Sequence, residues 1–390
     1  MIKKLLIFDF LIGVFSFSVC FLIFSSELGS YFGIKEITPV ILLYLFLMRS
    51  TLMNTEKNTN LPLIIWVSSL LILLFILVLV GGATRITDSG LSITEWEVLI
   101  GILPPLSESS WIIEFEKYKK IPEYILVNSS MTLSEFKVIY LWEWGHRLLA
   151  RLVGLVCVIP LIIFYFMKKL SKPVIRRSVL ISILIGIQGY IGWYMVQSGL
   201  TQRVDVSQYR LSIHLLMAFI IIYNTLMLLF EVTNIKLINT NGTRPIWFSF
   251  FSIIVFVQIF SGGLMSGLDA GLVYPTWPLM GLSIVPSDYW IPQIEIYNLF
   301  ENRSNVQFNH RTLGYLILLL GLLNVYLSRN NYFMLKVSLL TLLLIFVQIA
   351  LGIFTIILMV PWETALLHQF FSLLVFSSIT FSLYLSRFGK

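Results

Sequence analysis

The chain contains four histidines, and each lies in or at the edge of a long apolar run. They are His146, His214, His310 and His368. An ionisable residue in a membrane helix costs about 2.5–3.5 kcal/mol at the helix centre, so we expect the set to be functional. Paired imidazoles on facing helices are typical of bis-histidine haem ligation. Zinc is less favoured, because no acid or thiolate lies near each pair at ligand spacing. For any single histidine, a hydrogen-bonded packing role is the alternative.

Three arginines lie close to the histidines. Arg147 and Arg311 each directly follow a histidine, and Arg210 lies one turn before His214 on the same helix face. Guanidinium groups pair with carboxylates in a bidentate manner, and haem carries two propionates. The spacing therefore predicts propionate binding. Arginines at helix ends that extend to the lipid headgroups are the alternative.

One carboxylate distinguishes the first half of the chain. Glu143 lies three residues before His146, whereas the position three residues before His310 is Gln307. A cofactor site needs no acid, but a reacting site needs a proton acceptor or a charge stabiliser. We therefore predict a reaction site in the first half and a cofactor site in the second. An ion pair of Glu143 with Arg147, four residues on, is the alternative.

The elements that position these residues are membrane helices. The chain has 390 residues, of which 57% are hydrophobic and 12% charged, with a mean hydropathy of +0.88. Soluble proteins carry roughly 25% charged residues, and a bilayer-spanning helix needs about 20 apolar ones. Eight apolar runs are predicted to span the membrane, at residues 62–82, 140–166, 176–198, 209–231, 246–266, 311–328, 332–360 and 364–386.

The charges predict orientation and do not indicate a nucleic-acid partner. Segment 168–177 holds five basic residues and no acid, whereas loop 83–139 holds eight acids against five bases. By the positive-inside rule, the loop lies outside and the basic segment inside. Every even-numbered span then starts on the outer side, and each carries one histidine near that end. The four histidines are therefore expected at similar depth.

An internal repeat divides the chain. GGATRITDSGLSITEW (81–96) and GGLMSGLDAGLVYPTW (262–277) share two glycines, an Asp, a Gly-Leu and a closing Trp at one constant offset. A His-Arg pair, a Q-x-x-I/L-G motif and a further histidine follow in both halves, which indicates duplication. We predict an all-α polytopic membrane protein with a core of two parallel four-helix repeats related by a pseudo-two-fold axis along the membrane normal. The expected divisions are a hydrophobic extension and linker at 1–61, an N-terminal half at 62–231 and a C-terminal half at 232–390. Gly81, Gly82 and Gly90 are expected to let the chain turn tightly at a helix end.

These motifs resemble the haem A synthase family. The resemblance rests on 81–96, EFKVIYLWEWGHRLLARLVG (135–154), QGYIGWYMVQSGL (188–200), VSQYRLSIHL (206–215), SGGLMSGLDAGLVYPTWPLM (261–280), FNHRTLGY (308–315) and LLHQ (366–369). It covers residues 62 to about 386. The two cysteines, Cys20 and Cys157, both lie outside loop 83–139. The chain therefore resembles the proteobacterial and mitochondrial subtype, which lacks a loop cysteine pair.

The resemblance implies an oxidoreductase that converts the C8 methyl group of haem O to a formyl group by successive hydroxylations. The product is haem A for cytochrome oxidase, and water is the implied oxygen source. Haem B is the implied cofactor, with His310 and His368 as iron ligands and Arg311 nearby. Substrate haem O is expected between His146 and His214, with Arg147 and Arg210 beside it and Glu143 as base or cation stabiliser.

The same resemblance implies partners and a location. Haem O synthase is expected upstream, together with an electron acceptor, membrane lipid and a possible homo-oligomer. The location is the bacterial cytoplasmic membrane or the mitochondrial inner membrane.

Two other functions compete with this prediction. A dihaem cytochrome that exchanges electrons with quinone would hold both haems permanently, but Glu143 without a counterpart favours the enzyme. A haem or metal transporter would need an opening on the inner side, yet ionisable residues occur there only at helix ends.

Overall fold

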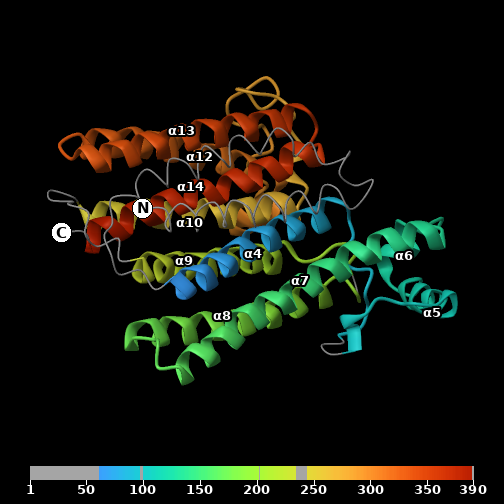
Figure 1. The fold of residues 1–390 in the computed structure, drawn as a ribbon. Helices are drawn as coiled ribbons and strands as arrows, with labels where there is room; N and C mark the ends of the chain where they lie inside the picture. Colours follow the sequence, from blue (N-terminus) through green and yellow to red (C-terminus); the bar gives the residue numbers. More distant parts are fainter. Residues whose placement is uncertain (1–60, 97–99, 202, 234–243, 389–390) are drawn as a thin grey trace.

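The computed structural model describes residues 61–96, 100–201, 203–233 and 244–388. Within these residues, eight helices are long and apolar enough to cross a membrane, which confirms the prediction of a multi-pass helical membrane protein (Figure 1). They are α4 (Leu61–Ile86), α7 (Leu133–Phe166), α8 (Lys172–Gln197), α9 (Gln208–Val232), α10 (Pro245–Gly267), α12 (Arg303–Ser328), α13 (Tyr332–Ile357) and α14 (Trp362–Phe388). The predicted N-terminal extension lies outside the described residues, except for Leu61 at the start of α4.

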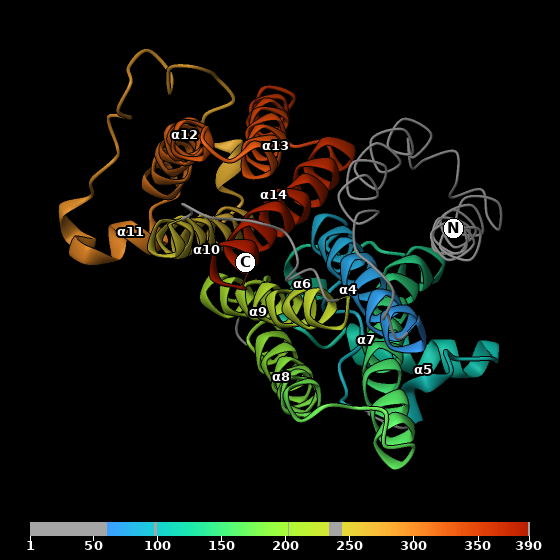
Figure 2. The same cartoon turned by 60° about the vertical axis from the view of Figure 1, so that its left-hand side comes forward.

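Four of the eight helices form the centre of the bundle. Helices α9 and α14 contact each other and both also contact α4 and α10, and α14 and α9 are the most buried of the eight. Helices α7 and α8 lie on one side of this group, with α12 and α13 on the opposite side (Figure 2). The outer helices α7 and α8 keep most of their surface exposed, as expected for helices that face lipid.

Small residues allow the two halves to approach closely between α9 and α10. A Cβ atom added at Gly263 would lie 2.6 Å from Ser212 Cα, and one added at Gly267 would lie 2.7 Å from Gln208 Cα. These glycines are four residues apart and therefore share one face of α10. Small residues at this spacing are typical of membrane helices that pack backbone to backbone. Substitution of Gly263 by leucine would force the two helices apart.

The acidic loop of the first half is folded over the bundle. It contains the short helix η2 (Ile100–Ile102), α5 (Glu108–Tyr118) and α6 (Pro122–Leu126). We call residues 87–96 and 100–132 the outer cap, because the charge distribution predicts the outer side for them. Rings of the cap pack on the first turns of α7, with Phe115 and Phe136 stacked 4.9 Å apart. The second half carries a less helical connection, with η4 (Ala270–Leu272), η5 (Pro292–Tyr297) and α11 (Asn298–Glu301).

Two helices begin earlier than their apolar runs predict. Helix α7 begins at Leu133, where Thr132 and Glu135 form a reciprocal capping box, and α12 begins at Arg303, capped by the Asn302 side chain. The predicted spans therefore began too late, at residue 140 for α7 and at residue 311 for α12. Hydropathy marks only the apolar part of a helix, whereas side-chain capping allows polar turns to precede it.

A polar contact joins the repeat motifs of the two halves. Asp88 and Asp269, which correspond at the constant offset, both adopt left-handed backbone angles, with φ of 47° and 49°. Arg85 forms ion pairs with both, at 2.8 Å and 3.0 Å, and donates to the Ser266 carbonyl. Corresponding turns thus meet at one point. The pseudo-two-fold relation and the boundaries of the two halves stay predictions.

Candidate active site

The C-terminal histidines face each other across the second half. The rings of His310 on α12 and His368 on α14 lie 6.5 Å apart, centre to centre, with an interplanar angle of 66°. Each ring lies against a glycine of a neighbouring helix. A Cβ atom added at Gly262 would lie 3.4 Å from the His310 ring, and one added at Gly352 would lie 2.9 Å from the His368 ring. Helices α10, α12, α13 and α14 therefore all contribute to this site.

Polar partners orient both rings. His368 Nδ1 lies 3.0 Å from the Gln348 carbonyl, a contact that makes Nδ1 the donor. His310 Nδ1 lies 3.2 Å from the Ser261 hydroxyl, and Gln258 donates to the His310 backbone carbonyl. A hydrogen bond on one ring nitrogen sets the tautomer of a histidine. The other nitrogen, Nε2, lies 3.3 Å from a glutamine amide nitrogen in both rings, that of Gln348 for His368 and that of Gln258 for His310, and a metal would replace this contact. The arrangement has the chemistry of a paired-imidazole ligand set.

The N-terminal histidines occupy corresponding positions in the first half. His146 on α7 lies against Gly81 of α4, with Nε2 3.1 Å from an added Cβ atom, and His214 on α9 lies 2.9 Å from one at Gly192 of α8. The helices that carry the two histidines, α7 and α9, both pack against α4. Gln188 donates to the His214 carbonyl at 3.1 Å. The structure thus brings together two of the predicted residues from α7 and α9, with glycines of α4 and α8 behind them.

The glycine pair of the first repeat motif has a different role from the predicted one. Gly81 and Gly82 lie inside α4, which continues to Ile86, so the prediction of a turn was wrong for these two residues, whereas Gly90 lies in the turn that follows the helix. Gly81 makes room for His146, and a Cβ atom at Gly82 would overlap the Gln369 side chain. Close approach of side chains from α7 and α14 therefore explains these glycines, not a chain reversal.

Glu143 is buried and hydrogen-bonded on both oxygens. Its side chain accepts from the Ser92 hydroxyl at 2.7 Å, from the Ile93 amide at 2.8 Å and from Arg147 at 2.7 Å. The residue is 3% exposed. Hydrogen bonds to a charged acceptor are about twice as strong as neutral ones, so this carboxylate is a fixed negative charge that also holds the outer cap. The ion pair with Arg147 is the contact that the sequence left open as an alternative.

The two arginines that follow histidines bind backbone carbonyls at corresponding positions. Arg147 donates to the carbonyls of Ile93 and Glu95 at 3.0 Å each. Arg311 donates to those of Tyr274 and Thr276 at 2.8 and 2.9 Å. Both guanidinium groups thus anchor the segment that follows the glycine pair. Their contacts position loops over the histidine sites.

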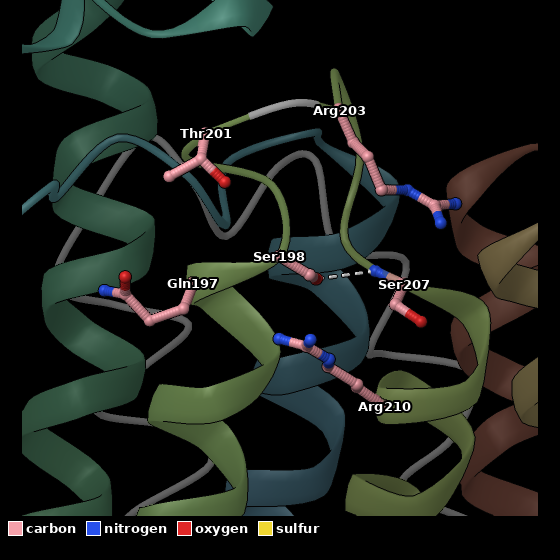
Figure 3. A pocket seen from close by; sticks show the side chains of 6 residues that line it. All are labelled: Gln197, Ser198, Thr201, Arg203, Ser207 and Arg210. Carbon is pink, nitrogen blue, oxygen red and sulfur yellow. Dashed lines mark hydrogen bonds between the residues drawn. The ribbon is translucent and has the colours of Figure 1, made fainter.

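The third arginine lines a polar pocket of about 240 Å³ between the outer ends of α8 and α9 (Figure 3). Arg210 extends from α9 toward α8, where it donates to the Tyr194 carbonyl at 2.6 Å and lies 3.6 Å from the centre of the Tyr194 ring. Arg203 lies at the upper rim of the pocket, and the Ser207 amide donates a hydrogen bond to the Ser198 hydroxyl between the two helix ends. Two guanidinium groups beside the N-terminus of a helix favour the binding of an anion in this pocket.

A second buried carboxyl lies in the outer cap, where the sequence reasoning had named no functional residue. Glu123 is 6% exposed, and burial raises its pKa to about 8. The negative charges of Asp88, Asp205 and Glu143 raise the pKa further, and the Tyr118 hydroxyl opposes them. Among eight acids in one loop, nothing in the sequence marks this one as buried.

Other residues that the sequence reasoning missed do carry a signal. Gln188 with Gly192, and Gln348 with Gly352, form the repeated Q-x-x-I/L-G motif. In each motif the glutamine and the glycine contact the same histidine. A repeated motif that lies one helix before each second histidine therefore predicts its packing partner.

Fold and site together define a polytopic membrane protein, in which the described residues form eight membrane-spanning helices that carry four histidines, two in each predicted half. The chain belongs to the COX15-CtaA family of cytochrome oxidase assembly proteins, whose family model matches residues 64–380.

Curated relatives extend this assignment. The chain is 42% identical over 335 residues to "Heme A synthase" of Chelativorans sp., a match that covers 84% of this chain and 92% of the relative. It is 41% identical to proteins of the same name from Mesorhizobium japonicum (80% of this chain, 86% of the relative) and Rhizobium etli (84% and 90%). The predicted resemblance to haem A synthases is confirmed.

Proposed function

We propose that this protein is a haem A synthase of the inner membrane, an oxidoreductase that converts the C8 methyl group of haem O to a formyl group. The observation that carries the proposal is one difference between two otherwise matching sites. Glu143 accepts a hydrogen bond from the Ile93 amide, whereas Gln307, which precedes His310 by the same three residues, donates to the Tyr274 carbonyl. Of these two corresponding positions, only that of the first half carries a carboxylate.

The reaction requires water and an electron acceptor. Conversion of a methyl to a formyl group with water as the oxygen source releases four protons and four electrons, by way of a hydroxymethyl group and a hydrated aldehyde. Haem O carries a long apolar tail, so a site within the membrane avoids exposure of the tail to water. The protein must therefore admit water and release protons from a site that lies within an apolar bundle.

The C-terminal site suits haem B as a resident cofactor. A metal–nitrogen bond of about 2 Å and the ring radius together place two imidazole centres on one metal about 6 Å apart. His310 and His368 lie 6.5 Å apart. The donor set therefore fits an iron porphyrin, which would supply electron transfer. Arg311 anchors the loop above this site and supports the cofactor pocket in that way.

The N-terminal site suits the substrate haem. His146 and His214 would hold its iron, and Arg210 with its polar pocket would receive the propionates. Arg147 fixes Glu143 and the outer cap at the same time. Because Glu143 accepts from three donors, its contacts favour a fixed charge that stabilises positive charge at the oxidised carbon over a mobile base.

Partners follow from the chemistry. Haem O must be delivered by the enzyme that adds its tail, and four electrons must leave to an acceptor. The apolar surfaces of α7 and α8 face lipid, and we include self-association among the partners to be tested.

The dihaem cytochrome is the second candidate, and pigment extraction distinguishes the two. The full-length protein is purified from cells that make haem O, and its haems are extracted and separated. One haem B together with haem O or haem A per chain is expected for the synthase. Two tightly bound haem B molecules per chain would contradict it.

Substitutions in the two sites should have different effects on bound haem and on product formation. Glu143→Ala should keep haem B bound but stop formation of the formyl group, because the charge beside the reacting carbon is lost. His310→Ala or His368→Ala should lose the resident haem. Normal haem A content in cells that carry only Glu143→Ala, or unchanged haem B in the histidine variants, would refute the assigned roles.

A further inference from the structure

A second polar pocket lies where α12 ends and α13 begins, beside the start of α10. Its volume is about 300 Å³. Arg244 and Arg329 line it together with the aromatic side chains of Trp247 and Tyr326, and none of its lining residues is an acid. We call it the inner pocket, because the charge distribution predicts the inner side of the membrane for these helix ends. No role in the site described above accounts for it.

The side chains of the inner pocket are held in place by contacts within the protein. The Arg329 guanidinium donates to the Tyr326 carbonyl at 3.0 Å and lies 3.8 Å from the centre of the Tyr326 ring. Trp247 Nε1 donates to Asn324 Oδ1 at 3.1 Å. Met334 is fully buried and adds apolar surface to the lining. A site whose side chains are already ordered loses less entropy when a ligand binds.

A directed series of hydrogen bonds ends at the inner pocket. Asn324 Nδ2 donates to the Ser338 hydroxyl at 3.1 Å, and Ser338 donates in turn to the Ser328 hydroxyl at 2.9 Å. Ser328 lines the pocket and is 6% exposed. Because Ser328 accepts from Ser338, its own hydrogen is left to donate, and no acceptor for that hydrogen lies among the residues that the structure describes. The lining thus contains a buried O–H donor in need of an acceptor.

Negative charge is scarce at this end of the helices. Glu231 is the only acid in the described turns at the inner ends, and it pairs with Arg177 at 3.7 Å. Within the described part of the chain, Arg244 and Arg329 form no ion pair. Anionic lipids give the inner leaflet a negative surface, and basic pockets between membrane helices on that side bind lipid headgroups. The charge of the inner pocket is therefore complementary to that surface.

We propose that the inner pocket binds the phosphate headgroup of an anionic phospholipid from the inner leaflet. Arg244 and Arg329 pair with the phosphate oxygens, and the Ser328 hydroxyl donates to the same group. Arginines that extend separately to the headgroups are the simpler interpretation, but they require neither a shared pocket nor a buried donor. The position at headgroup level favours a lipid over free phosphate. The inference does not depend on the proposed function.

The test is native mass spectrometry of the full-length protein in neutral detergent, titrated with phosphatidylglycerol. One tightly bound lipid per chain is expected, together with a higher midpoint of thermal unfolding. Phosphatidylcholine, which has a phosphate but no net charge, should bind more weakly. Arg244→Gln and Arg329→Gln should each weaken phosphatidylglycerol binding about fivefold. Ser328→Ala should weaken it about tenfold, because it removes a hydrogen bond to a charged group.

The matched control is Arg176→Gln, which removes the same charge from an exposed position at the start of α8, outside the inner pocket. This variant should bind phosphatidylglycerol as the unmodified protein does. Unfolding midpoints without added lipid show whether each variant folds, and Arg244→Lys, which keeps the charge, should retain most of the binding.

Two results would overturn the proposal. An equal loss of binding in Arg176→Gln, or equal binding of the two phospholipids, would mean that general attraction to a basic surface is sufficient. Inorganic phosphate at millimolar concentration should neither displace the lipid nor raise the midpoint. A rise in the midpoint with phosphate as large as that with phosphatidylglycerol would assign the pocket to a free anion and refute the lipid site.

Discussion

The glycines behind the histidines allow the ligand geometry to be tested without any change of the ligands. In Gly352→Ala, the added methyl group would lie 2.9 Å from His368 Cε1 and 3.3 Å from Nδ1. Ordinary van der Waals contact begins near 3.4 Å, so the ring or the helix must move by about half an ångström or more. Metal–nitrogen distances tolerate about 0.2 Å. The expected result is loss of His368 from the ligand set.

The assay is haem B content per purified chain, together with the absorption spectrum of the oxidised and reduced protein. We expect Gly352→Ala to lose haem B or to change from a six-coordinate to a five-coordinate spectrum. Alanine is favoured over glycine in a helix by about 1 kcal/mol, so a less stable α13 would not account for the loss.

Gly262→Ala is the matched control, because it adds the same methyl group beside the other ligand of the site. Its Cβ atom would lie 3.4 Å from His310 Cε1, within ordinary contact. This variant should retain haem B and its spectrum. Equal haem content and spectra in the two variants would refute the reasoning that ring position against these glycines controls ligation.

Two further predictions concern the stability of the cap and of the junction between halves. Arg85→Met removes ion pairs to Asp88 and Asp269 and a hydrogen bond to Ser266. It should lower the free energy of unfolding by about 1–2 kcal/mol, which is measured as a lower midpoint of thermal unfolding in detergent. An unchanged midpoint would exclude a stabilising junction. Burial raises the pKa of Glu123 from 4.5 to about 8, so the folded state holds a proton that the unfolded state has lost between these values. Stability should therefore fall as pH rises from about 4.5 to 8, by a few kcal/mol at most, and Glu123→Gln should abolish this fall; parallel pH–stability curves would contradict it.

The membrane helices were predictable because the bilayer imposes a simple rule on sequence. Each span needs about 20 apolar residues, and only a run of that length satisfies its backbone without water. Helix α14, for example, was expected at 364–386 and extends over Trp362–Phe388. The pairing of His310 with His368 could also be predicted from the sequence. The repeat assigns both residues to the C-terminal half, and the alternation of spans places both at the same end of the bundle. The prediction of facing pairs needed no knowledge of loop structure.

The outer cap was not predictable from the same signals. Helices α5 and α6 are short and polar, so neither hydropathy nor charge distinguishes them from a loop. Arg147 is predicted to bind a propionate, and its contacts with backbone carbonyls could not be foreseen beside that role, since a carboxylate and a carbonyl both accept from guanidinium. The carbonyls of Ile93 and Glu95 come within reach only after the cap folds. Burial of Glu123 depends on the same tertiary contacts.

The contacts of Glu143 and Gln307 explain how a repeated framework can hold two different chemistries. Both side chains bind the residue that lies three before the closing tryptophan of their repeat motif, Ile93 in one half and Tyr274 in the other. The carboxylate accepts from an amide, and the glutamine donates to a carbonyl. Both loops are therefore anchored, while only one site receives a negative charge. A substitution of Glu143 by glutamine removes this charge and still leaves a side chain able to hold the loop, so it separates the electrostatic role of Glu143 from its structural role.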